Sequence, residues 1–123
     1  AVDFSGSKVY ILNSKFELIS DKAISAGELS DITSVSNSFL NSSIGIASKD
    51  KSIVKVENNK FFQSKLYDVV AFNKKNFYEK GGIIHIQDND ESLNLKVKSD
   101  FTSEIFINTI KVKNEKFNLD EIY

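Results

Sequence analysis

Similar residues recur about every 22 positions along this chain of 123 residues, and this repeat limits the possible fold more than any other feature. Three kinds of position return in the same order three times: a serine, a β-branched apolar residue and a phenylalanine. They are Ser7, Ser30 and Ser52; Val9, Ile32 and Val54; and Phe16, Phe39 and Phe61. A fixed period of this length is typical of a fold in which one small structural unit stacks on copies of itself.

Apolar and polar residues alternate within each unit, which predicts short strands rather than helices. The alternation is clearest at 9–11, 54–56, 84–86 and 93–97, and it is weakest around Ser34 and Ser36. No segment sustains a helical apolar stripe for three turns. The residues between the apolar ones should point away from the core. These outward residues are Lys55, Glu57, His85, Gln87, Asn94, Lys96 and Lys98.

Short strands at a 22-residue period predict an all-β fold, a parallel β-solenoid of four to five coils. Each coil would lie on the next at the spacing of neighbouring strands, so equivalent side chains would stack. We therefore expect an interior column of Phe16, Phe39 and Phe61, and a polar ladder of Ser14, Asn37 and Asn59 at a turn. The alternative is an antiparallel sandwich with evenly spaced strands, but such a sandwich has no reason to repeat residue identities.

The repeat divides the chain into one domain, 1–123, with coils at about 1–22, 23–44, 45–67 and 68–92. The last region, 93–123, loses the 22-residue register and is expected to be either a cap over the open sheet edge or one more coil. The chain opens inside the pattern, at Ala1, without an initiator Met. We therefore expect it to be a fragment of a longer solenoid.

The fourth coil contains an inserted loop at 76–82, with the aromatic residues Phe77 and Tyr78 and a pair of glycines. A loop that bulges from a regular scaffold often carries function. The alternative is an insertion that the fold merely tolerates.

Composition excludes several classes of protein. There is no Cys, so neither a disulfide framework nor a Cys-ligated metal is possible. The net charge is −1 and all basic residues are lysines, which disfavours binding to nucleic acid. No apolar run approaches the roughly 20 residues that a membrane-spanning helix needs.

Three segments in a fixed order carry a resemblance to a known family: 21–28 (DKAISAGE), 44–50 (IGIASKD) and 72–75 (FNKK), with 3–7 as an earlier coil. They resemble bacterial right-handed parallel β-helix repeat proteins, including those attached to spore-coat-kinase-like domains at cell surfaces. The resemblance implies a right-handed helix and an extracellular or cell-envelope location, but no kinase activity in this chain. The sequence departs from the family pattern at Asp68, where a small residue is usual, and at Asn76, where a proline often stands.

Charged residues recur at equivalent turns of successive coils: Glu28, Lys49, Asp50, Lys74 and Lys75. Stacking should place Glu28 near Lys49 or Asp50, and Asp50 near Lys74. These groups would form either a polar groove for a sugar, with general acid and base groups, or an ion-pair ladder that fixes the register of the turns. The absence of Arg weakens the first interpretation, because Arg is the usual bidentate partner of a carboxylate substrate.

Neither His85 nor the acidic stretch 88–91 predicts a catalytic or metal site. His85 is the only histidine and has no second metal ligand at a motif spacing. The acidic stretch lacks the spacing of an EF-hand loop. No catalytic residue, metal or cofactor is therefore expected.

Three functions remain open. The first is a non-catalytic structural or binding module of a larger bacterial surface or secreted protein. It would hold other domains, a polysaccharide or a surface protein through the loop at Phe77 and Tyr78, the pair Lys74 and Lys75, and the outward lysines 55, 96 and 98. The second is a fragment of a polysaccharide lyase or epimerase, with its site at Glu28, Lys49, Asp50 and Lys74. The third is a trimeric phage-type spike.

Overall fold

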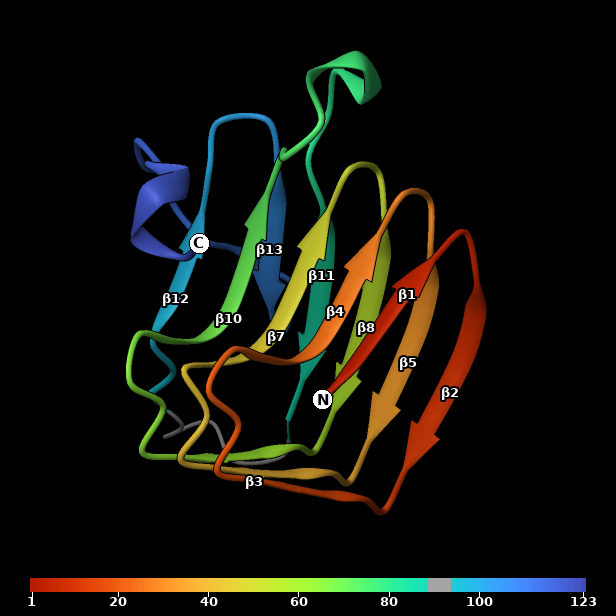
Figure 1. The fold of residues 1–123 in the computed structure, drawn as a ribbon, viewed down its shortest axis with the longest axis vertical. Helices are drawn as coiled ribbons and strands as arrows, with labels where there is room; N and C mark the ends of the chain where they lie inside the picture. The colour runs from red at the N-terminus through yellow and green to blue at the C-terminus, as the bar shows by residue number, and fades with distance from the viewer. Residues whose placement is uncertain (89–93) are drawn as a thin grey trace.

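Three parallel sheets wind into a solenoid of about four turns in this computed structural model, which describes residues 1–88 and 94–123 (Figure 1). Sheet A contains β1 (Val2–Ser5), β4 (Lys22–Gly27), β7 (Ile44–Lys49), β10 (Tyr67–Phe72) and β12 (Val97–Ser99). Sheet B contains β2 (Lys8–Leu12), β5 (Asp31–Val35), β8 (Ile53–Glu57), β11 (Ile83–Gln87), β13 (Glu104–Ile107) and β14 (Ile110–Lys111). Sheet C contains β3 (Lys15–Glu17), β6 (Ser38–Leu40) and β9 (Lys60–Phe62).

The winding is right-handed, as the resemblance implied. In Figure 1 the chain rises through the near sheet, descends through the far sheet and moves from right to left with each turn. In the part of the chain that the structure describes, every strand pair is parallel except β13 with β14. The antiparallel sandwich is therefore wrong.

The predicted column of phenylalanines is confirmed. Phe16, Phe39 and Phe61 are register partners on β3, β6 and β9. Their ring centroids are 5.1 and 4.9 Å apart and the ring planes are within 8° of parallel. Phe39 is fully buried between the other two. The repeat thus places a continuous aromatic stack along the interior of the solenoid.

The predicted polar ladder is also confirmed. Asn37 accepts a hydrogen bond from the Ser14 backbone N–H at 2.7 Å, and Asn59 accepts one from the Asn37 backbone N–H at 3.1 Å. Ser34 explains the weak point in the apolar pattern. Its buried hydroxyl lies between the two asparagines, accepting from Asn37 at 2.7 Å and donating to Asn59 at 2.9 Å. A hydroxyl satisfies amide groups that an apolar residue would leave unpaired.

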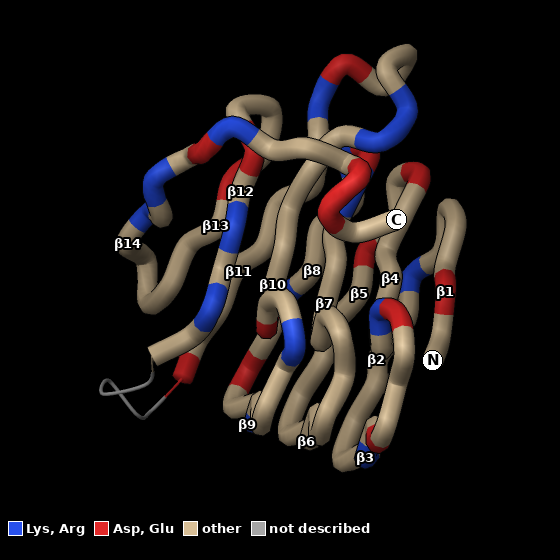
Figure 2. Tube along the Cα trace, turned by 60° about the vertical axis from the view of Figure 1, so that its left-hand side comes forward, with Lys and Arg blue, Asp and Glu red and all other residues tan. Residues whose placement is uncertain are grey.

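The C-terminal region combines both expectations: β12 and β13 add a partial further coil, parallel to β10 and β11, and the chain after β13 forms a cap. Strand β14 turns back along β13 and covers that edge of sheet B. The chain then binds the edge of sheet A, where the Glu115 N–H donates to the Ser99 carbonyl at 2.8 Å. It continues across the outer face of sheet A, through the short 3-10 helix η2 (Leu119–Glu121), and ends beside β4 (Figure 2).

Apolar contacts hold this tail on sheet A. Phe117 stacks on the buried Phe72, with centroids 5.2 Å apart, and Ile122 packs on the same outer cluster, which includes Ile44 and Val70.

The strand expected at 93–97 was placed too early. Leu93 lies outside the described residues, Leu95 is not in a strand, and β12 begins at Val97. The described helices are too short to cross a membrane.

Candidate functional site

The charged turn cluster, which we define as Glu28, Lys49, Asp50, Lys74 and Lys75, gathers around one hollow of about 270 Å³. All five residues line it, at the ends of β4, β7 and β10. The stacking of the coils therefore brings together the residues that the sequence placed at equivalent turns.

Asp50 ties one turn to the next. Its side chain is buried, and Oδ1 accepts hydrogen bonds from the backbone N–H groups of Lys74 and Lys75 at 2.8 and 2.9 Å. The expected proximity of Asp50 to Lys74 is confirmed, but it is the lysine backbone that binds the carboxylate. Oδ2 has no hydrogen-bond partner in the described part of the chain.

Glu28 lines the same hollow as Lys49 and Asp50, as expected, but its ion-pair partner is Lys75. Lys75 lies one coil beyond Lys49 and Asp50, and the Glu28 carboxylate also accepts a hydrogen bond from the Ser5 hydroxyl at 3.0 Å. The hydrogen bond from Lys75, and then the one from Ser5, lower the pKa of the Glu28 carboxyl. The same contact with Glu28 raises the pKa of the Lys75 ammonium.

The ring of Tyr123 lies among three lysines, namely Lys49 and Lys74 of the cluster and Lys22 on β4. The Nζ atoms of Lys22, Lys74 and Lys49 lie 4.0, 4.5 and 6.0 Å from its centroid. Burial lowers the pKa of the Lys49 ammonium and raises the pKa of the Tyr123 phenol. The C-terminal residue thus shields three positive charges, a cation–π arrangement that nothing in the sequence predicted.

The inserted loop projects beyond the strand ends, as expected, but it does not line the hollow (Figure 1). Phe77 and Tyr78 lie in the 3-10 helix η1 (Asn76–Tyr78), with ring centroids 4.4 Å apart, and Phe77 is 75% exposed. The glycines at the base of the loop are structural. A Cβ at Gly82 would lie 2.1 Å from the Ser48 carbonyl oxygen, and one at Gly81 would lie 1.8 Å from the Ser103 hydroxyl.

Two of the outward lysines are less available than expected. Lys98 is covered by the tail, where it contacts the Phe117 ring and pairs with Glu121 at 3.3 Å. The Lys96 ammonium donates to the Ser64 carbonyl. Lys55 is exposed, and it belongs to a second hollow.

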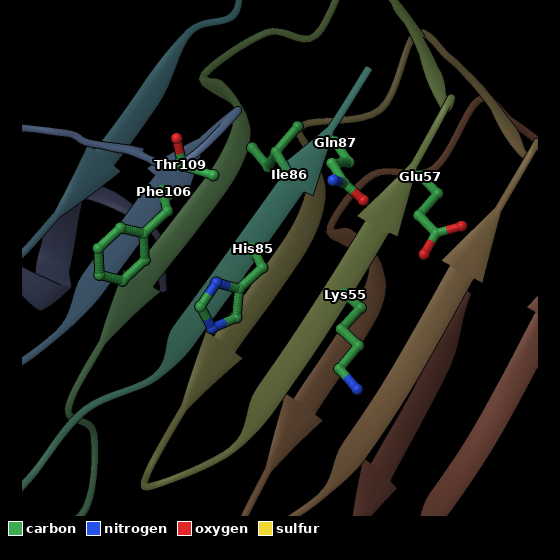
Figure 3. Close-up of a pocket in the computed structure, with 7 residues that line it drawn as sticks. All are labelled: Lys55, Glu57, His85, Ile86, Gln87, Phe106 and Thr109. Atoms are coloured by element: carbon green, nitrogen blue, oxygen red, sulfur yellow. The ribbon is translucent and has the colours of Figure 1, made fainter. Parts of the chain in front are cut away.

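This second hollow, the sheet B groove, was not predicted. It holds about 410 Å³ on the outer face of sheet B (Figure 3). One wall is the outward column Lys55, His85 and Phe106, which are register partners on β8, β11 and β13. The other wall is Glu57, Gln87 and Thr109. Part of the floor is Ile86.

The alternation had placed Lys55, Glu57, His85 and Gln87 outward, which the structure confirms. Phe106 was missed because it lies in the region that loses the 22-residue register. The signal was present in the pattern Ile105-x-Ile107, which puts Phe106 outward in the coil after His85. In the described part of the chain, no three His, Asp or Glu side chains are placed to hold a metal ion.

Comparison with protein-family models found no match, and comparisons with curated proteins and with solved structures found none.

Proposed function

We propose that this chain is a non-catalytic β-solenoid module that presents a binding surface within a larger bacterial surface or secreted protein. The bacterial and extracellular or cell-envelope setting follows from the family resemblance of segments 21–28, 44–50 and 72–75. Its partners would be the neighbouring domains of that protein and a polysaccharide or surface protein outside it.

One observation carries the non-catalytic role: the Asp50 carboxylate already accepts hydrogen bonds from the backbone of the next coil. A general acid or base must be free to exchange a proton with a substrate. One oxygen of Asp50 holds two backbone N–H groups, and Glu28 is paired with Lys75. The charged turn cluster therefore supports a role in fixing the register of the coils.

A lyase or epimerase is the second candidate, because Oδ2 of Asp50 is unpartnered among the described residues and the cluster lines a hollow of about 270 Å³. Incubation with polyuronates, with and without Ca²⁺, separates the two candidates. The non-catalytic module leaves the absorbance of unsaturated uronate ends unchanged. A rise in absorbance that Asp50→Asn abolishes would establish the enzyme instead.

A trimeric phage-type spike is a third candidate, and light scattering tests it. A module that acts as one chain should elute at the mass of a single chain, 13.8 kDa. A trimer would favour the spike.

A further inference from the structure

The sheet B groove differs from the charged turn cluster in having its polar side chains free. Within the described residues, the side chains of Lys55, Glu57, Gln87 and Thr109 form no hydrogen bond or ion pair. Its volume of about 410 Å³ is in the range of small-molecule sites, about 300–1,000 Å³. The groove therefore has both the space and the unused donors and acceptors that a ligand needs.

The two walls of the groove have different chemistry (Figure 3). On the first wall, His85 stacks on Phe106 with centroids 5.1 Å apart and planes 9° apart. Aromatic rings of this kind offer apolar surface and attract C–H groups through the negative charge of the ring face. On the second wall, Glu57, Gln87 and Thr109 offer a carboxylate, an amide and a hydroxyl.

We propose that the sheet B groove binds an uncharged oligosaccharide along the solenoid axis. This inference names the ligand class of the presenting module proposed above and rests on that proposal. A sugar ring has C–H groups for the aromatic wall and hydroxyls for the polar wall. Lys55 and Glu57 bring opposite charges to the groove, so its charge is balanced and it does not favour a polyanion.

An extended peptide fits the groove less well. A peptide that joins a sheet gains its affinity from backbone hydrogen bonds to a free strand edge. Strands β8, β11 and β13, which form the groove, each have a neighbouring strand on both sides. The groove consequently offers side chains only.

The turn that brings Thr109 to the groove is strained. Asn108 and Thr109 have φ of 47° and 72°, and a left-handed conformation is unusual for a β-branched residue. The surrounding structure holds the turn, because Asn108 accepts from the Asp88 N–H at 3.0 Å and its own N–H donates to the Ile86 carbonyl at 2.8 Å. These hydrogen bonds hold Thr109 in place at the edge of the groove.

The single histidine of the chain makes the test direct, because its ring protons give one set of NMR signals. Cellohexaose, chitohexaose, xylohexaose and maltohexaose are each titrated to millimolar concentration while the His85 signals are followed. At least one of these sugars should shift the signals in a saturable way. Gln87→Ala, at an exposed side chain without hydrogen bonds, should weaken binding severalfold, and Phe106→Ala by roughly tenfold or more, about 1.4 kcal/mol.

Phe62→Ala is the matched control, since Phe62 is an exposed aromatic residue on β9 of sheet C and does not line the groove. Its affinity should equal that of the unaltered protein. The proposal is overturned if no sugar moves the His85 signals, if Gln87→Ala binds as tightly as the control, or if only a peptide or a polyuronate binds. Uronate turnover would overturn the proposed function, and it is read by absorbance independently of the His85 signals.

Discussion

Glu28 and Lys75 form an ion pair between the second and fourth coils of the solenoid, reaching past the intervening coil. The contact joins residues 47 positions apart in the sequence. Its carboxylate and ammonium are both partly exposed, so the pair is expected to add specificity of stacking more than stability.

The first prediction concerns the pKa of Glu28. Lys75→Met should raise this pKa toward its ordinary value of 4.5, since the hydrogen bond from Lys75 is the main cause of the lowering. Ser5→Ala should raise it less. The lowered pKa makes the pair favour folding above pH 4.5, and that contribution is lost as the pH falls through the pKa of the folded state. Carbon-13 NMR titration measures the pKa, and an unchanged value in Lys75→Met contradicts the pairing.

The second prediction concerns Asp50. Asp50→Ala removes the acceptor of two backbone N–H groups and should lower the free energy of unfolding by about 2 kcal/mol or more. Asp50→Asn should cost less, because it keeps one oxygen and tolerates the positive φ of 52°. Urea denaturation measures both. Lys55→Ala, at an exposed side chain, is the control and should unfold like the unaltered protein.

The third prediction compares two members of the phenylalanine column. Phe39→Ala should lower the free energy of unfolding by about 3–5 kcal/mol, because Phe39 is fully buried. Phe16→Ala removes an identical side chain from the partly exposed end of the column and should cost clearly less. Equal losses in urea denaturation would contradict the stack.

The repeat made most of the scaffold predictable. Stacked coils place a residue beside its own counterpart, so the columns of Phe39 and Asn37 could be read from spacing alone. Ser34 belonged to the same ladder, but its role depended on two side chains from neighbouring coils, which a one-dimensional pattern does not show.

The cap and the sheet B groove could not be predicted in the same way. The tail has no repeat, and its path depends on apolar contacts such as Phe117 on Phe72. Three lysines lie near Glu28, and which of them forms the ion pair depends on how far each side chain reaches. The sequence pattern therefore did not indicate Lys75 as the partner. The groove could be predicted only by pairing His85 with Phe106. Phe106 lies beyond the end of the 22-residue period, so the repeat did not indicate this pair.

The fourth prediction concerns alkaline pH. Burial raises the pKa of the Tyr123 phenol, so the folded protein keeps a proton that the unfolded chain loses near pH 10.0. Stability should therefore fall as the pH rises above 10.0. Tyr123→Phe cannot ionise and should show a smaller fall, which thermal unfolding across this pH range measures. Identical pH profiles would show that Tyr123 is not held on sheet A.

The fold and the sheet B groove both require parallel coils stacked in register, and a spin-label distance tests that arrangement most directly. The chain has no cysteine, so Tyr10→Cys with Phe106→Cys gives a doubly labelled protein without background. Tyr10 lies on β2 and Phe106 on β13, four strand steps apart in one outward column. At about 4.8 Å for each step, the two backbone positions are about 19 Å apart. Both labels project from the same face of sheet B, so electron-electron double resonance should give a distance between the labels close to this value. A separation far from this value would contradict the stacked coils and the groove built on them.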